Sequence, residues 1–412
     1  MLPATQLKIG QPAMRWSAHA HSIAEIEREL LRIWSTPDLT TRIDGAPGRH
    51  IAARTSVMNL VVIARRPEVA ERCAATIQSL TGRHPSRTIV IQSADPDGPS
   101  WLDARIDAHC VLPREDAPEI CAETISVTCG GESGRHLAAI AMPLVVHDLP
   151  VTVWWPGEPS FATQAAKDLL TGADRLIVDG STWSGDGLVR LREMARLPRT
   201  MRLAVSDFAL IRQSRWREAI ASTFDDPEFL PYLGSIRRIA VTYSTHDEDE
   251  APGSTNLVKP VYHVAWLASR LGLTVETPLS PAGTRGRAAV AAGRGPSARP
   301  APGRGLVATL SDGRSDVAVV IRPVISPTPA GTTLRVELLA ERRGSELRTD
   351  VTAEVEAVHV RVWQDGVEVL DRRFRAARRT DVDLLAESIE TGRRDAVAMG
   401  ALRSAADLAG PL

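Results

Sequence analysis

The stretch Met142 to Pro159, MPLVVHDLPVTVWWPGEP, carries the strongest structural signal in the chain. Its apolar run ends in Trp154 and Trp155 and predicts a β-strand, which Pro156-Gly157 terminates. Neighbouring side chains of a strand point to opposite faces, so both tryptophans can be buried only if the sheet is covered on both sides. Two interpretations follow: the pair belongs to the core, or it lies at a site rim or partner-facing edge with Glu158 beyond it.

The loop His147-Asp148 leads into this strand. Loops at strand ends in α/β sheets are the usual ligand-binding places, although the rule favours the carboxyl ends and this loop precedes its strand. Asp148 could instead form a turn by bonding the backbone near Pro150. Both a structural turn and a contact with a partner or ligand are therefore open for Asp148.

Strand and helix patterns alternate on both sides of this stretch. Strands are predicted at 55–64, 87–93, 174–179, 201–206 and 235–243, and helices at 67–80, 160–170, 186–196, 207–222 and 259–271. The short apolar runs near 176 and 203 suit strands that are buried on both faces. Such alternation predicts an α/β fold with a mostly parallel sheet flanked by helices.

Two serines are predicted to start helices. Ser22 precedes an amphipathic pattern, and Glu25 stands three positions later, as in a capping box. Ser133 lies in Gly130-Gly-Glu-Ser-Gly134, which resembles a nucleophile elbow, but the glycine after the serine comes one position too early. We therefore predict Ser133 as the N-cap of a helix over 133–146.

The composition changes towards the C-terminus. Pro, Gly, Ala and Arg dominate 278–305, which predicts a flexible linker or long loop. Short strands in meander order and two closing helices then predict a smaller C-terminal α+β domain with an antiparallel sheet over 306–412. The preceding 15–277 is predicted as the α/β region, with two subdomains split near residue 131 as an alternative.

Composition and charge disfavour several classes of protein. The chain has 49 basic and 50 acidic residues and a net charge of −1, so no general attraction to nucleic acid or an anionic membrane is expected. No apolar run approaches the roughly 18 residues of a membrane span, and no signal-peptide pattern opens the sequence. We expect a cytoplasmic protein with neither nucleic acid nor membrane as a partner.

The cysteines do not form a metal-binding pattern. Cys73, Cys110, Cys121 and Cys129 include no CxxC pair, and no histidine pair stands at finger spacing, so no metal site is predicted. In a reducing compartment all four are expected to be free thiols.

No catalytic constellation is evident in the sequence. Neither GxGxxG nor GxxxxGK[ST] occurs, so no catalytic residue and no cofactor-binding residue is predicted, although phosphate could still bind at a helix N-terminus. Three polar clusters are better explained by surface loops and turns: His19-Ala-His21, Asp225-Asp226 and His246–Glu250.

Several short motifs together resemble the OpcA-type assembly proteins of glucose-6-phosphate dehydrogenase. The tryptophan stretch is one of them, with Asp148 at the aspartate of the DLP signature. The others follow in the family's order: Asn59–Ile63, Arg83–Ile91, Asp174–Asp179, Asp207-Phe208, Trp216–Glu218, Phe224–Pro227 and Trp266–Gly272. The resemblance is close over roughly residues 15 to 275 and looser beyond.

The resemblance implies a non-catalytic accessory protein of the oxidative pentose phosphate pathway. Such a protein would bind glucose-6-phosphate dehydrogenase and promote its assembly or tune its activity, and NADP would belong to the partner, so no cofactor is expected on this chain. Arg215-Trp216-Arg217 has the composition of an interface anchor if exposed, whereas an inward face would make Trp216 core. The predicted partner contacts are Asp148, Trp154, Trp155, Pro156, Gly157, Glu158, Arg215, Trp216 and Arg217.

An alternative function belongs to a different class. An α/β sheet with many arginines could serve an independent enzyme or sensor that binds a sugar phosphate or a nucleotide at strand ends. The two functions can also combine, with a metabolite effector as a second partner, if two sites on the chain are energetically coupled.

Overall fold

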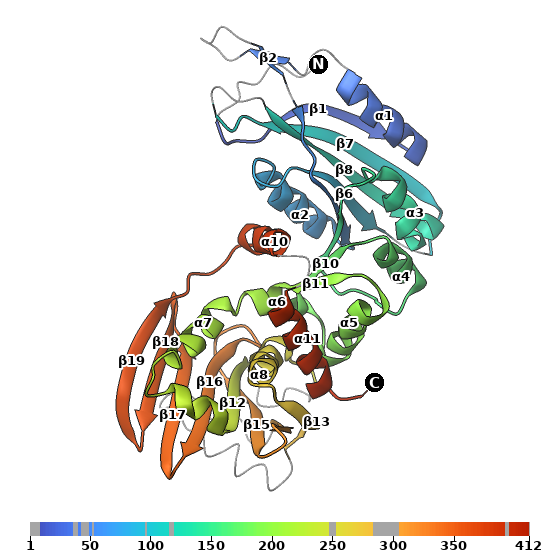
Figure 1. Ribbon diagram of the computed structural model, residues 1–412. Helices are drawn as coiled ribbons and strands as arrows, with labels where there is room; N and C mark the ends of the chain where they lie inside the picture. Colours follow the sequence, from blue (N-terminus) through green and yellow to red (C-terminus); the bar gives the residue numbers. More distant parts are fainter. Residues whose placement is uncertain are drawn as a thin grey trace. The chain divides into compact units, whose positions relative to one another are not determined.

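The structure is a computed structural model that describes residues 9–35, 40–42, 49–51, 53–94, 97–114, 119–246, 253–282, 305–391 and 395–411 (Figure 1). The chain divides into two compact units. The first contains Met1–Val178, Thr200–Val205 and Thr380–Arg393, and the second contains Asp179–Arg199, Ser206–Arg379 and Arg394–Leu412. The chain therefore passes between the units several times.

A mixed sheet lies at the centre of the first unit. In the described part of the chain it has nine strands in the order β1-β7-β8-β6-β5-β9-β10-β11, with β4 beside β8. The block β8-β6-β5-β9-β10 is parallel, whereas β1 and β7 join it through antiparallel pairs. The strands are β1 (Ala13–Ala20), β4 (Ala53–Arg54), β5 (Met58–Ala64), β6 (Ser86–Ser93), β7 (Trp101–Val111), β8 (Ile120–Gly130), β9 (Val151–Trp155), β10 (Arg175–Val178) and β11 (Ala204–Asp207).

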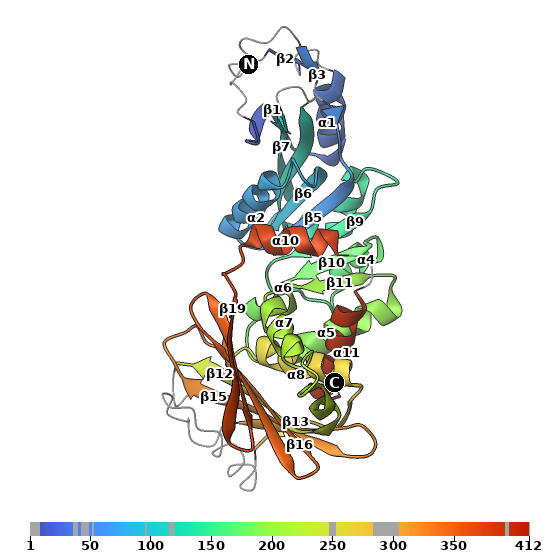
Figure 2. The ribbon, with the colours of Figure 1, turned by 60° about the vertical axis from the view of Figure 1, so that its left-hand side comes forward.

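Helices flank this sheet, as the α/β pattern predicts. They are α1 (Ile23–Ser35), α2 (Pro67–Ser79), α3 (Leu137–Ala141), α4 (Gln164–Thr171) and α10 (Asp381–Glu390). Helix α10 comes from near the C-terminus and lies against α2 (Figure 2), where His84 and Glu390 form a 2.8 Å contact across 306 residues of sequence. A small antiparallel pair, β2 (Thr40–Arg42) with β3 (Arg49–Ile51), completes the described strands here.

The predicted helix caps had different outcomes. Ser22 accepts a 3.3 Å hydrogen bond from Glu25 N, and the Glu25 carboxylate accepts one from His21 N at 2.7 Å, so Ser22 caps α1 as predicted. The prediction for Ser133 is wrong: its side chain caps nothing, and 133–146 is broken into a 3₁₀ turn (Gly131–Arg135), short α3 and a second 3₁₀ turn (Met142–Leu144). Pro143 lies inside that second turn, where its ring prevents a continuous helix.

The tryptophan strand is buried on both faces. Every residue of β9 is buried, and the exposed fractions are 1% for Trp154 and 4% for Trp155. Strand β9 lies between β5 and β10 in the parallel block, so its main-chain groups are paired along both edges. Burial of all five residues shows that both side-chain faces are covered as well. The core interpretation of the tryptophan pair is the one that the structure shows.

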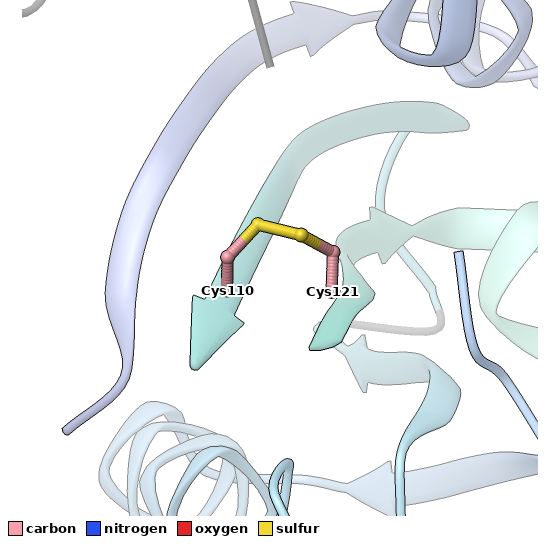
Figure 3. The surroundings of a disulfide bond; sticks show 2 residues. All are labelled: Cys110 and Cys121. Atoms are coloured by element: carbon pink, nitrogen blue, oxygen red, sulfur yellow. A yellow bond between two sulfur atoms is a disulfide. The ribbon is translucent and has the colours of Figure 1, made fainter. Parts of the chain in front are cut away.

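Two of the four cysteines form a disulfide, which corrects the prediction of four free thiols. Cys110 and Cys121 are directly opposite in the antiparallel pair β7·β8, with Cα atoms 4.1 Å apart (Figure 3). Opposite positions of an antiparallel pair bring Cβ atoms close enough for a disulfide, and the sequence spacing does not reveal such a pairing. Cys73 and Cys129 are free and buried, and burial raises the pKa of the Cys73 thiol to about 12.

The second unit contains a second, mostly antiparallel sheet. Among the described residues it has eight strands in the order β13-β14-β15-β12-β16-β17-β18-β19. Only the pair β12·β15 is parallel. The strands are β12 (Ile236–Thr245), β13 (Thr274–Pro281), β14 (Leu306–Ser311), β15 (Asp316–Ile325), β16 (Thr333–Arg342), β17 (Ser345–Ala353), β18 (Ala357–Gln364) and β19 (Val367–Arg375).

Helices of the second unit include the last helix of the chain. They are α5 (Leu188–Thr200), α6 (Phe208–Ile211), α7 (Ser214–Thr223), α8 (Val258–Leu271) and α11 (Ala396–Leu408). Helix α11 packs on α8 (Figure 1). Ten of the fourteen residues of α8 are buried. None of the helices in the described ranges combines the length and apolar character needed to cross a membrane.

One strand of the predicted α/β alternation lies in the second sheet. The strand predicted at 235–243 is β12, which pairs with β15 and β16. Its sheet membership depends on partners that come later in the chain, so local alternation could not show it. Of the predicted linker 278–305, positions up to 281 belong to β13, and 283–304 lie outside the described residues.

Candidate functional site

The turn before β9 is held by one buried side chain, that of Asn59. Asn59 lies in β5 with an exposed fraction of 0%. Its Nδ2 donates to the carbonyls of Val146 and Leu149 at 3.0 and 3.2 Å, and its Oδ1 accepts from Val146 N at 2.7 Å. The Asn59 backbone N–H also donates to Pro150 O at 2.8 Å. This one residue therefore satisfies most of the polar main chain in the turn.

Asp148 is at the exposed tip of this turn. Its φ of 67° is in the left-handed region, which aspartate tolerates better than most residues with a Cβ. The predicted bond from its carboxylate to the backbone near Pro150 is not formed: within the described residues the carboxylate has no hydrogen-bond partner. The turn is therefore built by Asn59, and the Asp148 carboxylate faces solvent from a fixed backbone.

A cavity of about 740 Å³ opens beside this turn, and its lining residues all belong to the first unit. Met58, Pro150 and Arg175 lie at or next to the amino ends of β5, β9 and β10, so the cavity is at the end of the sheet opposite to the usual ligand site. His84 and Asp148 also line it.

Most polar groups around the cavity already have structural partners. Asp174 Oδ2 accepts from Val151 N at 2.9 Å, which fixes the start of β9. The Arg175 guanidinium donates to the carbonyls of Ser388 and Thr391 at 2.6 and 2.8 Å, which satisfies the C-terminal end of α10. These bonds hold the cavity wall in place. The exposed Asp148 carboxylate, which has no such bond within the described residues, is the lining group best placed to contact another molecule.

Replacing Asn59 with alanine is expected to lower the free energy of unfolding by about 2–3 kcal/mol, because the turn loses its buried amide and keeps unsatisfied polar groups. Urea denaturation followed by circular dichroism measures the change. Gln164→Ala is the matched control, since that amide makes only an exposed hydrogen bond on α4, and it should cost less than about 0.5 kcal/mol. Equal losses in the two variants would show that Asn59 does not hold the turn.

The predicted contact residues fall into two groups, one in each unit. In the first unit Asp148 is exposed, Gly157 and Glu158 are half-buried, and Pro156 is buried with the two tryptophans, so neither tryptophan is an exposed anchor in this structure. The remaining three residues are on α7 in the second unit.

The α7 group is only partly exposed. Trp216 is half-buried, and its ring packs on His263 with a centroid distance of 5.1 Å, which agrees with the inward alternative. Arg217 donates to Leu210 O at 2.5 Å, so it also has a structural contact. Arg215 is exposed and pairs with Glu218 at 2.6 Å. Arg215 is thus the member of this group that is most available to a partner.

A second polar cluster was missed as a site in the sequence. The division between the units falls inside β11, after Val205, so all residues of this cluster belong to the second unit. Its centre is Asp207, the last residue of β11, with an exposed fraction of 3%. Asp207 Oδ1 accepts from Gly180 N at 2.9 Å and Ala209 N at 2.8 Å, and Oδ2 accepts from the Tyr262 hydroxyl at 2.9 Å. Burial outweighs these bonds and raises the pKa of Asp207 to about 7.

Asp179 and Arg212 extend this cluster. Arg212 NH1 lies 2.7 Å from each carboxylate oxygen of Asp179 and donates to Ser181 Oγ at 3.1 Å. Asp179 directly follows β10, and its side chain also caps the 3₁₀ turn Gly180–Thr182. The sequence did contain a signal for this cluster: Asp179 and Asp207 each stand at the end of a short apolar run. Such positions are candidates for a site, because ligand-binding groups are common at the carboxyl ends of parallel strands.

The fold and these two clusters define a two-unit α/β protein. Asn59 holds the turn before strand β9, and Asp179 and Asp207 hold the turns that follow β10 and β11. Residues 77–196 match the family described as glucose-6-phosphate dehydrogenase subunit N-terminal domain, and residues 203–401 match the corresponding C-terminal domain. The chain belongs to this OpcA-type family of glucose-6-phosphate dehydrogenase subunits. Family membership confirms the resemblance read from the sequence.

One curated relative is a Synechocystis sp. protein that carries the name OxPP cycle protein OpcA. It is 25% identical over 199 residues, which are 48% of this chain and 39% of the relative. The chain thus matches well under half the length of that relative.

Solved structures give weaker likenesses. An NAD binding oxidoreductase from Klebsiella pneumoniae is 13% identical with a TM-score of 0.43, over 86% of this chain and 95% of that chain. The transcriptional regulator Gal80p from Kluyveromyces lactis is 11% identical with a TM-score of 0.42, over 87% and 91%. Biliverdin reductase from Synechocystis sp. PCC 6803 is 12% identical with a TM-score of 0.41, over 86% and 98%.

Proposed function

We propose that this protein is a non-catalytic accessory subunit that binds glucose-6-phosphate dehydrogenase and promotes its assembly or tunes its activity. The observation that carries this proposal is the match of both family domains, which together cover most of the chain. The name of the Synechocystis relative agrees with it. NADP and the catalytic residues would then belong to the dehydrogenase.

The Asp148 turn is the best candidate in the first unit for the dehydrogenase contact. Its carboxylate is exposed, has no partner among the described residues, and is presented by a backbone that buried Asn59 fixes. A rigid charged tip loses little conformational entropy on binding, which favours recognition. The buried Trp154 and Trp155 would support this turn from within the sheet and would not touch the partner.

The experiment combines the purified protein with the glucose-6-phosphate dehydrogenase of the same organism. Size-exclusion chromatography with light scattering measures complex formation, and dehydrogenase assays measure kcat and KM with and without the protein. We expect a stable complex and a change in at least one kinetic constant. Two purified proteins that neither form a complex nor alter the kinetics, with nucleotide and sugar phosphate present, would refute the proposal.

Replacing Asp148 with asparagine is expected to weaken the complex about tenfold, a typical loss for one contact of moderate strength. Asparagine keeps the left-handed backbone conformation accessible, so the variant removes the charge with little strain. Binding is measured by titration calorimetry. Asp168→Asn on α4, also exposed and in the same unit, is the control and should bind like the unaltered protein. Equal affinities for all three proteins would remove Asp148 from the interface.

A further inference from the structure

We propose that the cavity beside the Asp148 turn receives an arginine side chain of glucose-6-phosphate dehydrogenase. This inference rests on the proposed function, and it adds the chemistry of the partner residue and the depth to which that residue enters. The described residues that line the cavity all belong to the first unit.

Three of the motifs found in the sequence meet at this cavity. From them come His84, then Asp148, Leu149, Pro150 and Thr152, and finally Asp174 and Arg175. Helix α10 contributes Ile389. The volume of about 740 Å³ is within the range of about 300–1,000 Å³ that is usual for ligand sites. The cavity therefore has room for a long side chain and the residue next to it.

The cavity extends from an exposed rim to a buried wall. Val57 lies at the rim with an exposed fraction of 52%, whereas Met58 and Thr152 are only 5% and 4% exposed. Leu149 and Pro150 add further apolar surface. The long apolar stem of an arginine can pack on such a surface while its guanidinium reaches a polar group. The lining thus suits a side chain that is apolar along its length and charged at its tip.

The charged groups of the lining favour a cation. Among the described lining residues, the carboxylates are those of Asp148 and Asp174, and the guanidinium is that of Arg175. Arg175 donates to two main-chain carbonyls at the end of α10, at 2.6 and 2.8 Å. The lining therefore has an excess of negative charge at the Asp148 turn, which attracts a cation and disfavours an anion such as phosphate.

The basic groups next to Asp148 are paired elsewhere. His84 Nε2 lies 2.8 Å from Glu390 Oε1, and a guanidinium nitrogen of Arg83 lies 2.5 Å from the same oxygen. Within the described ranges, neither of these groups forms a salt bridge with Asp148. The Asp148 carboxylate is therefore open to a cation from another molecule.

An arginine fits this carboxylate better than a lysine does. A guanidinium can donate two parallel hydrogen bonds to one carboxylate, provided that the carboxylate is held in one orientation. The turn supplies that constraint, because Asn59 bonds its main chain and Asp148 has a φ of 67°. Attraction between the two charges is also stronger where water is partly excluded than on an open surface.

Replacing Val57 with tryptophan tests whether the partner enters the cavity. The indole would fill the entrance, and the exposed position of Val57 lets the fold accept it. We expect the complex with the dehydrogenase to be at least about tenfold weaker by titration calorimetry. Val189→Trp is the matched control, since Val189 is an exposed apolar residue on α5, and this variant should bind like the unaltered protein.

Reversing the charge of Asp148 tests the chemistry of the partner residue. Asp148→Arg should weaken the complex roughly a hundredfold, because it places like charges opposite each other. Arginine can adopt the required backbone conformation, as Arg343 does with a φ of 53°. Asp168→Arg on α4 is the control and should leave the affinity unchanged. Each surface arginine of the dehydrogenase is then replaced with aspartate, and one of these variants should bind Asp148→Arg to within about tenfold of the unaltered complex.

The outcomes separate this inference from the proposed function. A complex that forms normally with Val57→Trp, or one that no arginine variant of the dehydrogenase restores with Asp148→Arg, would overturn the inference and leave the proposed function in place. If the two unaltered proteins form no complex, the proposed function fails and this inference fails with it.

Discussion

Replacing Trp154 with alanine is expected to lower the free energy of unfolding by about 3–5 kcal/mol, the usual cost of deleting a buried aromatic side chain. Trp154 is among the largest fully buried side chains, with an exposed fraction of 1%. Its strand pairs with β5 through Val62 and with β10 through Ile177, so the cavity would open between three strands of the parallel block. Urea denaturation followed by circular dichroism measures the loss.

Trp101→Ala is the matched control for this prediction. Trp101 begins β7 in the same sheet, but 42% of its surface is exposed, so its replacement should cost about 1 kcal/mol or less. Similar losses in the two variants would contradict the core assignment of Trp154. Weaker dehydrogenase binding by Trp154→Ala would not by itself identify an interface residue, because the Asp148 turn immediately precedes this strand.

Trp154 and Trp155 show which structural features can be predicted from the sequence and which cannot. Alternation along a strand shows that Trp154 and Trp155 point to opposite faces of the sheet. Both side chains are then buried only if other elements cover both faces. That coverage depends on the tertiary packing of the first unit, which includes α10, a helix more than two hundred residues away in the chain that packs on α2. Local patterns predict the strand and its end well, while the choice between core and rim requires the tertiary structure.

Asn59, Cys110 and Cys121 illustrate why other features were not predictable. Asn59 is one polar residue at the start of an apolar run, and its role depends on a turn 87 residues later. The disulfide depends on strand register, which sequence spacing alone does not give. In each case the local pattern predicts the element correctly, and the long-range pairing decides the function of the side chain.

The Asp207 cluster was partly visible in the sequence. Asp179 and Asp207 were recognised as parts of family motifs, and both follow apolar strands. Their convergence with Arg212 and Tyr262 needs the packing of α8 on the segment that contains α6. Tyr262 in particular reads as one more apolar position of a helix, and only the structure shows its hydroxyl on Asp207.

Asp207 should also give the protein a distinctive pH dependence of stability. Its pKa is about 7 in the folded protein against 3.8 for an unperturbed aspartate, so the folded state holds a proton that the unfolded state releases between about pH 4 and 7. The unfolded state then binds fewer protons, and stability falls as the pH rises through this window. Three pKa units correspond to about 4 kcal/mol, fully lost above the folded pKa.

His263 works in the opposite direction over part of the same range. Burial lowers its pKa to about 3, so the unfolded state gains a proton below about pH 6.5 that the folded state refuses, and stability falls as the pH drops. The two groups partly cancel in the unaltered protein, whose stability profile can look flat. A comparison between the protein and a variant at Asp207 isolates the contribution of that carboxyl.

Asp207→Asn is therefore expected to gain stability relative to the unaltered protein as the pH rises from 4.5 to 8, by about 3 kcal/mol. The asparagine oxygen can still accept from Gly180 N and Ala209 N, and its amide can donate to Tyr262, so the geometry survives while the titration disappears. Urea denaturation of both proteins at pH 4.5, 6 and 8 gives the difference. Parallel profiles would mean that Asp207 stays ionised in the folded protein over this range and does not contribute to the pH dependence of stability.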